Sequence, residues 1–299
     1  MNKDSMKREI NDRVRLIDRA LEKYLPVEQD PPETLHRAMR YSVFAGGKRL
    51  RPVLFLASAE AVGGSTEPLL PAACALELIH TYSLIHDDLP AMDNDDYRRS
   101  KLTNHKVFGD AVAILAGDAL LTQAFGLIAQ CGLTGKIDCQ TVVRVIGEVV
   151  AAAGSEGMIG GQVVDIESEN KTIDKSVLRY IHAHKTGALF RASIRGGALM
   201  GGGSASQLSE LTEYAENLGL AFQITDDILD VEGDSEKLGK TVGSDERKRK
   251  CTYPAIYGLQ ESKELARNSV EKAKKALKNL GAGANILRYI AEYLLHRET

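Results

Sequence analysis

The chain has 299 residues, and its 38 Lys and Arg residues against 41 Asp and Glu residues give a formal charge of −3 at neutral pH. This near-balance argues against a nucleic-acid-binding protein, which would carry a basic excess or a basic face. With 43% hydrophobic and 26% charged residues, the composition is that of a globular protein and excludes a disordered or collagen-like chain.

Helices are predicted along the whole chain, because prolines are few, Trp is absent and long segments are rich in Ala, Leu, Glu and Lys. An apolar stripe over residues 14–25 predicts an amphipathic opening helix. Pro31-Pro32 precedes a second helix over 33–44, which Gly46-Gly47 ends, and Pro52 starts the next. Later Gly- and Pro-containing breaks divide the chain into about ten helical segments. No pair of strands with a hairpin turn is expected, and no linker interrupts the chain. We therefore expect an all-α protein with a single domain over residues 1–299.

The N-terminus is charged and amphipathic and lacks the apolar core of a signal peptide. The longest stretch without a charge, 119–135, falls short of the roughly 20 apolar residues that a bilayer span needs. We therefore expect no membrane span and a cytoplasmic location.

Cysteine and histidine spacing gives no zinc signature. The pair His182 and His184 would point its rings in different directions on a helix, so core or surface histidines are expected. No C-x-x-C pair occurs, and we expect free thiols that serve in packing at Cys74, Cys131, Cys139 and Cys251.

Two apolar helical segments, 76–88 and 218–227, each lead into a cluster of aspartates. In the second cluster, Asp226, Asp227 and Asp230 share one helix face at spacings of three and four residues. Like charges at this spacing repel one another, so the cluster favours a bound cation. Ligands that are all oxygen indicate Mg²⁺, with Mn²⁺ as the alternative.

In the first cluster an ideal helix would hold Asp93 far from Asp87. Pro90 cannot continue the helical hydrogen bonds, so we expect the helix to kink or end near Leu89 and the chain to fold Asp93 back toward Asp87. A calcium-binding EF-hand loop starting at Asp93 is excluded, because Tyr97 stands where the loop needs a ligand and the following position lacks glycine.

Cations that could bind phosphate groups accompany both clusters. Arg98 and Arg99 follow the first, Lys240 follows the second, and the segment 46–52 (GGKRLRP) places further cations at a helix boundary. Because Mg²⁺ keeps waters or substrate phosphates in its coordination shell, these cations indicate diphosphate sites. A nucleotide-binding P-loop at Lys240 is excluded, since Asp234 stands where that motif needs glycine.

Together these motifs resemble the trans-prenyl diphosphate (polyprenyl) synthase family, and most of all its bacterial farnesyl diphosphate synthases. The matching segments occur in the family's order: GGKRLRP (46–52), HTYSLIHDDLPAMDNDDYRR (80–99), GGQVVD (160–165), KTGALF (185–190), FQITDDILD (222–230) and LGKTVGSD (238–245). Departures are small: Ser100 where many members have Gly, and 249–251 (RKC) where many have Gly-Lys-Ser.

The resemblance implies an all-α homodimer whose helices surround a deep central cavity, with the two acidic clusters facing each other across its mouth. It implies Mg²⁺ ligands at Asp87, Asp93 and Asp226, supported by Asp88, Asp227 and Asp230. It implies that the allylic diphosphate is held by Arg98, Lys185 and Lys240. Isopentenyl diphosphate would be held without metal by Lys48, Arg51, His80 and Arg99, while Thr186 and Gln223 would face the reacting carbons. The resemblance thus implies a catalytic role for Asp87, Asp93, Lys185 and Asp226.

The implied reaction is an Mg²⁺-dependent head-to-tail condensation of isopentenyl diphosphate with dimethylallyl and then geranyl diphosphate. Tyr82 and Ser83 lie about one helical turn before Asp87, and a bulky Tyr82 would limit the pocket to a C15 product. A geranylgeranyl or longer-chain synthase remains the alternative. A terpene cyclase would not need Lys48 and Arg51, and a non-catalytic subunit would have broken acidic motifs.

Overall fold

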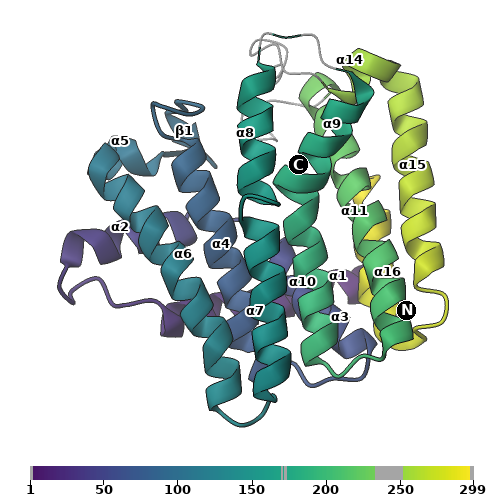
Figure 1. The fold of residues 1–299 in the computed structure, drawn as a ribbon, viewed down its shortest axis with the longest axis horizontal. Coiled ribbons are helices and arrows are strands. Elements are labelled where there is room, and N and C mark those ends of the chain that lie inside the picture. Colours follow the sequence, from purple (N-terminus) through teal and green to yellow (C-terminus); the bar gives the residue numbers. More distant parts are fainter. Residues whose placement is uncertain (1–2, 170, 172–173, 233–251, 297–299) are drawn as a thin grey trace. The chain divides into compact units, whose positions relative to one another are not determined.

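The structure is a computed structural model that describes residues 3–169, 171, 174–232 and 252–296. The described chain is helical apart from one short pair of strands, which confirms the all-α class (Figure 1). It divides into two compact units. The N-terminal unit comprises Lys7–Val53 and Glu67–Ile146, and the C-terminal unit comprises Met1–Met6, Leu54–Thr66 and Gly147–Thr299. The single domain and the central cavity stay predictions.

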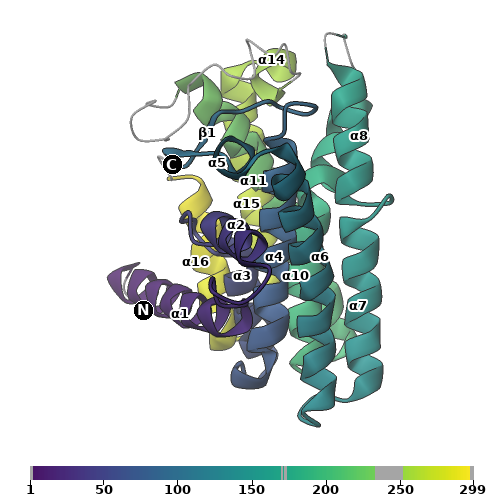
Figure 2. The ribbon, with the colours of Figure 1, turned by 90° about the vertical axis from the view of Figure 1, so that its left-hand side faces the viewer.

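In chain order the first helices are α1 (Lys3–Tyr24), α2 (Glu33–Val43), α3 (Leu50–Ala61), the 3-10 turn η1 (Glu67–Leu69), α4 (Leu70–Asp87), α5 (Asn104–Phe108), α6 (Asp110–Leu133) and α7 (Cys139–Ala153). Helix α2 begins at Glu33, as the sequence predicts, and α3 begins at Leu50, two residues before Pro52, whereas α1 begins at Lys3, well before the apolar stripe over 14–25. In the N-terminal unit α4 and α6 lie side by side (Figures 1 and 2). Every residue from Pro71 to Ile79 on α4 is buried, as is typical of a helix that is apolar on all sides.

The C-terminal unit holds the remaining helices. They are α8 (Met158–Ser168), α9 (Lys175–Ile181), the π-helical turn η2 (His182–Gly187), α10 (Ala188–Met200), α11 (Ala205–Glu232), α14 (Tyr253–Tyr257), α15 (Leu259–Ala276), the 3-10 turn η3 (Ala282–Ala284) and α16 (Asn285–Leu294). The long helix α11 packs against α10 and α15. In this core the buried Tyr214 of α11 donates a hydrogen bond of 2.7 Å to the carbonyl of Leu287 on α16.

A short hairpin corrects the expectation that no strand pair would form. Strands β1 (Tyr97–Arg98) and β2 (Lys101–Leu102) pair antiparallel, with Tyr97 opposite Leu102. Between them Arg99 (φ 53°) and Ser100 (φ 60°) both adopt left-handed backbone conformations. A turn of this kind favours Gly or Asn, and neither residue is present, which is why the sequence pattern missed it.

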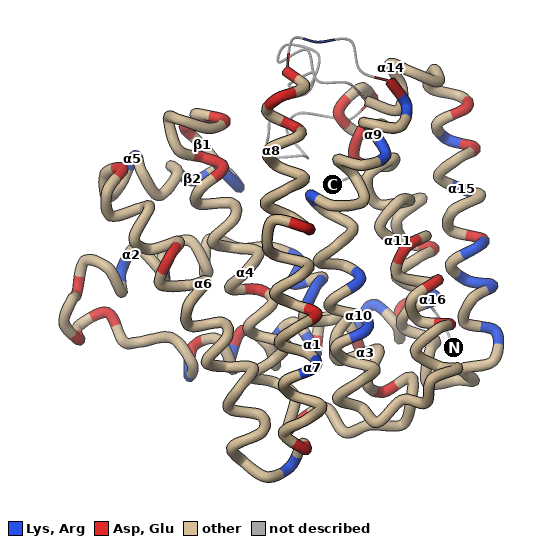
Figure 3. The backbone as a smooth tube through the Cα atoms, viewed as in Figure 1, with Lys and Arg blue, Asp and Glu red and all other residues tan. Residues whose placement is uncertain are grey.

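Among the described residues, two helical stretches are long and apolar enough to cross a membrane by length and composition. The stretch Glu67–Asp87 is 72% buried over its most apolar part, as expected of a core helix. The stretch Asp110–Leu133, helix α6, is only 39% buried there and carries few charges (Figure 3). The absence of a membrane span stays a prediction.

The described cysteines are free thiols, as expected. Cys74 and Cys131 are buried, but Cys139 is exposed, so a packing role is wrong for that residue. Cys251 lies outside the described residues.

Candidate active site

The first acidic cluster forms a closed turn at the end of α4, in the N-terminal unit. The helix ends at Asp87, and Asp88 is its cap residue. The backbone N–H of Asp93 donates a hydrogen bond of 2.8 Å to the carbonyl of Asp87, and that of Asn94 donates one of 3.1 Å to Leu89. The expected return of Asp93 to Asp87 is therefore confirmed, and Pro90 lies inside the turn. Asp87 and Asp93 are both half-buried, so a ligand can reach their carboxylates.

Asp88 binds a cation of its own chain. Its two carboxylate oxygens accept hydrogen bonds of 2.8 and 2.9 Å from Nε of Arg98, and one oxygen lies 2.6 Å from Nη2 of Arg98. Asp88 is only 3% exposed, and this burial raises its pKa, while Arg98 opposes the rise. The resemblance assigns Asp88 to the metal and Arg98 to the allylic diphosphate, yet in the structure the two side chains bind each other. Asp88 thereby holds the guanidinium of Arg98 beside the acidic turn.

Three segments bring basic residues together: Arg51 at the start of α3, Arg99 in the turn between β1 and β2, and the neutral imidazole of His80 on α4. Burial, with the charges of Arg51 and Arg99, holds the pKa of His80 well below its usual value. Burial, together with the charge of Arg99, lowers the pKa of Arg51 to about 10. These residues therefore form a site where positive charge is concentrated and partly desolvated, which favours a multiply charged anion. Lys48 is exposed on the same segment.

Arg99 is held by the glycine pair of the segment 46–52. Its Nη1 donates a hydrogen bond to the carbonyl of Gly46. A Cβ atom added at Gly47 would lie 2.8 Å from the guanidinium of Arg99, so only glycine leaves room for it. Gly46 (φ 104°) and Gly47 (φ 130°) both have backbone conformations that favour glycine.

Tyr82 is buried on α4, with 4% of its surface exposed. Its hydroxyl has no hydrogen-bond partner among the described residues, and burial, with the charge of Asp87, raises its pKa to about 12. Its ring meets the edge of His86, whose imidazole lies against Gly117 of α6, where an added Cβ would be 2.1 Å from Nε2. The hydroxyl of Ser83 instead donates a hydrogen bond of 2.9 Å to the carbonyl of His80. Of the two predicted chain-length residues, Tyr82 therefore presents the bulk.

The second acidic cluster belongs to the C-terminal unit, where α11 continues through it to Glu232. Asp226 is half-buried, whereas Asp227 and Asp230 are buried. Asp227 accepts a hydrogen bond of 2.9 Å from the backbone N–H of Tyr253 and thereby fixes the start of α14. Asp226 is consequently the most accessible carboxylate of this cluster.

The turn η2 carries Lys185 and Thr186. Nζ of Lys185 lies 2.6 Å from Oδ2 of Asp165 on α8. The segment GGQVVD lets α8 approach closely, because a Cβ at Gly161 would lie 2.3 Å from the backbone nitrogen of Lys185. Asp165 is therefore a functional candidate to which the sequence analysis gave no role. Thr186 and Gln223 are both half-buried, and Lys240 lies outside the described residues.

His182 and His184 meet different surroundings, as expected. His182 is buried with its Nε2 4.0 Å from Oδ2 of Asp227, and burial lowers its pKa to about 4. The ring of His184 stacks on that of Tyr180, with centroids 3.8 Å apart.

The donors present suit a hard divalent cation, because the acidic clusters offer only carboxylate oxygens. Within the described ranges, no three His, Cys, Asp or Glu side chains gather closely enough to hold a metal ion alone. Carboxylates in ones and twos fit Mg²⁺, which binds through one or two carboxylates and completes its coordination shell with waters and substrate phosphates.

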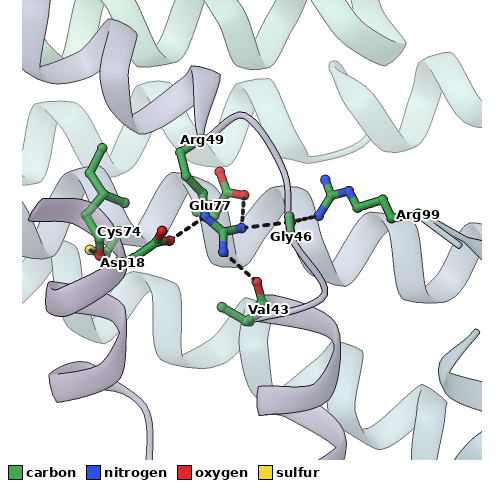
Figure 4. A network of polar contacts seen from close by, with 8 residues as sticks. Asp18, Val43, Gly46, Arg49, Cys74, Glu77 and Arg99 are labelled. Atoms are coloured by element: carbon green, nitrogen blue, oxygen red, sulfur yellow. Dashed lines mark hydrogen bonds and ion pairs between the residues drawn. The ribbon is translucent and has the colours of Figure 1, made fainter. Parts of the chain in front are cut away.

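Arg49 has a role that its sequence context does not reveal, because it stands among the other cations of the segment 46–52. Arg49 is 4% exposed and ion-paired with Asp18 and Glu77 (Figure 4). One signal was available, since Glu77 is the single charged residue in the apolar stretch from Pro71 to Ile79. A buried carboxylate of this kind needs a cationic partner.

Comparison with known proteins gives the class. The family model for polyprenyl synthetases matches residues 32–288. The chain therefore belongs to the polyprenyl synthetase family, and it is an enzyme of the prenyltransferase class.

Individual relatives cover nearly the whole chain. It is 49% identical to a farnesyl diphosphate synthase of Geobacillus stearothermophilus, over 98% of both chains. It is 46% identical to a geranylgeranyl diphosphate synthase of Cyanophora paradoxa, over 96% of this chain and 94% of that one. Among solved structures, geranylgeranyl pyrophosphate synthetase of Pyrococcus horikoshii matches with a TM-score of 0.88 and 35% identity, over 99% of both chains.

Proposed function

We propose that this enzyme is a farnesyl diphosphate synthase, which joins isopentenyl diphosphate head to tail to dimethylallyl and then to geranyl diphosphate and releases diphosphate. One observation carries the proposal. Helix α4 bears His80, next to the charges of Arg51 and Arg99, and ends in the acidic turn of Asp87 and Asp93. A site rich in cations beside one helix and a site rich in carboxylates at the end of that helix suit two diphosphates, one bound directly and one bound through metal.

Mg²⁺ would act as a Lewis acid on the allylic diphosphate. Its ligands would be Asp87 and Asp93, supported by Asp88, in the first acidic cluster, and Asp226, supported by Asp230, in the second. Arg98, Lys185 and Lys240 would bind the same leaving group. Cleavage of the carbon–oxygen bond builds negative charge on that group, so fixed cations stabilise the transition state more than the ground state. The pairs Arg98–Asp88 and Lys185–Asp165 support such preorganisation, because each holds its cation in place.

The allylic fragment becomes positive as the bond breaks. Thr186 and Gln223 offer neutral oxygens that stabilise this charge without adding a reactive nucleophile. The double bond of isopentenyl diphosphate then attacks the allylic cation and forms the new carbon–carbon bond. The released diphosphate takes the proton that the resulting cation loses. This scheme requires no Ser-His-Asp triad and no reactive cysteine, in agreement with the raised pKa of the buried Cys131 thiol.

The C15 product length rests on Tyr82, whose ring occupies buried space one turn before Asp87. The 49% sequence identity to the farnesyl diphosphate synthase of Geobacillus stearothermophilus supports a C15 product. A geranylgeranyl synthase is the second candidate, favoured by the 46% identity to the Cyanophora paradoxa enzyme.

Association into a homodimer is also part of the proposal. Helix α6 is apolar and little buried, and it exposes Ile114 (43%), Leu115 (57%) and Leu133 (85%). Such side chains favour contact with a second copy of the chain. Sedimentation equilibrium of the wild type tests this, and a monomer at micromolar concentration would contradict it. The cytoplasmic location stays a prediction.

Product analysis tests the function. The purified enzyme is incubated with Mg²⁺, labelled isopentenyl diphosphate and either dimethylallyl or geranyl diphosphate, and product lengths are resolved by chromatography. We expect a C15 product from both starters that disappears with EDTA. A C20 product would establish the geranylgeranyl alternative, and no product from either starter would refute a prenyl synthase.

Two substitutions test the role of Tyr82. Tyr82→Ala removes the ring and should lengthen the main product beyond C15. Tyr82→Phe is the matched control: it keeps the ring and removes a buried hydroxyl that lacks a partner in the described chain, so product length and stability should not fall. Unchanged products from Tyr82→Ala would show that Tyr82 only fills the core.

A further inference from the structure

Arg49 forms a buried network at the start of α3 that no step of the proposed reaction uses. Its Nε lies 2.8 Å from Oδ1 of Asp18 on α1, and its Nη1 lies 2.9 Å from Oε1 of Glu77 on α4. Nη2 donates a hydrogen bond of 2.8 Å to the carbonyl of Val43, and Nη1 donates one of 3.3 Å to that of Gly46. Figure 4 shows the guanidinium at the centre of these contacts.

The network is costly for a role in packing alone. Arg49 is 4% exposed and Glu77 is 2% exposed, so both charges are withdrawn from water. A buried ion pair often contributes no more to stability than apolar residues of the same volume would. What the pair supplies here is fixed geometry, because the fork of Arg49 binds two carboxylates and two backbone carbonyls at once.

That geometry acts on the segment 46–52. Arg49 itself has a left-handed backbone (φ 50°), which costs free energy for any residue with a Cβ and persists only where surrounding contacts impose it. The carbonyl of Gly46 accepts hydrogen bonds from both Arg49 and Arg99. The guanidinium of Arg99 therefore rests on a loop whose path is set from behind by Arg49.

We propose that Arg49, held between Glu77 and Asp18, is a positioning residue for isopentenyl diphosphate. It fixes the loop at Gly46 and Gly47 and thereby orients Arg99 toward this substrate. The same fixed loop orients its chain neighbours Lys48 and Arg51. This inference rests on the proposed function. It predicts that weakening the network impairs binding of isopentenyl diphosphate and leaves binding of the allylic diphosphate unchanged.

Steady-state kinetics of two conservative variants test the proposal. Arg49→Lys keeps the charge beside Glu77 but loses the fork, and Glu77→Gln keeps the shape of the partner but removes its charge. For both we expect the KM for isopentenyl diphosphate to rise about tenfold, the equivalent of one or two hydrogen bonds. The KM for geranyl diphosphate should stay within twofold of the wild type. Dissociation constants for isopentenyl diphosphate, measured by calorimetry without metal, should rise by the same factor.

Arg195→Lys is the matched control. Arg195 binds both oxygens of Glu148 (2.8 and 2.7 Å) and the hydroxyl of Thr212 (2.6 Å), so this substitution removes a similar fork at a site that the proposed reaction does not involve. It should lower the unfolding midpoint without raising the KM for isopentenyl diphosphate.

Three results would overturn the inference. The first is an unchanged KM for isopentenyl diphosphate in Arg49→Lys and Glu77→Gln. The second is an equal rise in both substrate KM values. The third is an equal rise of the KM for isopentenyl diphosphate in Arg195→Lys. Each of these results would show that Arg49 contributes only to stability. Failure of the proposed function is recognised separately, because the wild-type enzyme would then consume no isopentenyl diphosphate.

Discussion

The neighbouring glycines 46 and 47 offer a comparison in which one substitution displaces Arg99 and the other does not. Both have positive φ, 104° and 130°, so alanine at either position strains the backbone by about 1–3 kcal/mol. At Gly46 an added Cβ meets nothing within 4 Å, whereas at Gly47 it lies 2.8 Å from three atoms of the Arg99 guanidinium. Ordinary contact begins at 3.4 Å, so Arg99 must withdraw by roughly 0.6 Å or more in Gly47→Ala.

Withdrawal weakens the hydrogen bond that Arg99 donates to the carbonyl of Gly46. Because its donor is charged, this hydrogen bond contributes about 1.5–3 kcal/mol. If the orientation of Arg99 controls binding, the KM for isopentenyl diphosphate rises roughly 10- to 100-fold in Gly47→Ala relative to Gly46→Ala. The assay varies isopentenyl diphosphate at saturating geranyl diphosphate, and urea unfolding of both variants measures the shared strain. Equal KM values in two folded variants would refute the reasoning.

Four further outcomes follow from the described geometry. Ser100→Gly should raise the free energy of unfolding by about 1 kcal/mol in urea titration, because it relieves a left-handed conformation in an exposed turn. Unfolding free energy should fall as pH drops below about 6.5, because burial with Arg51 and Arg99 keeps His80 neutral in the folded state while the unfolded chain binds a proton; this slope should be shallower in His80→Gln. Asp226→Asn should lower kcat roughly 100-fold at saturating Mg²⁺ with an unchanged unfolding midpoint, since Asp226 is half-buried. Gly161→Ala should cost about 1–3 kcal/mol of stability and raise the KM for geranyl diphosphate, because its Cβ would lie 2.3 Å from the backbone of Lys185.

Features that depend on local rules were predictable from the sequence. Pro90 cannot extend a helix, and this alone implied an end near Leu89, two residues beyond the observed end at Asp87, and the return of Asp93 toward Asp87. The spacing of Asp226 and Asp230 placed both on one helix, as found. The family motifs located the remaining candidates.

Features that depend on contacts between distant segments were not predictable. The hairpin at Arg99 and Ser100 lacks the residues that usually mark such a turn, and it is held from outside: the hydroxyl of Tyr41 donates a hydrogen bond of 2.8 Å to the carbonyl of Leu102. The partners of Arg49 lie on α1 and α4, far from it in the sequence. No local pattern distinguishes a cation that anchors a loop from one that faces a ligand.

That distinction changes the electrostatic argument for the anion site. The segment 46–52 and the pair Arg98-Arg99 give a strongly positive sequence, yet Arg49 is neutralised by Glu77 and Asp18, and Arg98 by Asp88. Arg99 instead donates to the neutral carbonyl of Gly46 and keeps its full charge, and burial lowers the pKa of Arg51 to about 10. A depressed pKa means that the charged form of Arg51 is under-stabilised in this state, so an arriving diphosphate gains more from it than from a solvated cation. Affinity for isopentenyl diphosphate should therefore depend on Arg51 and Arg99 more steeply than on the exposed Lys48, and the ratio of KM values for Arg51→Gln and Lys48→Gln measures the difference.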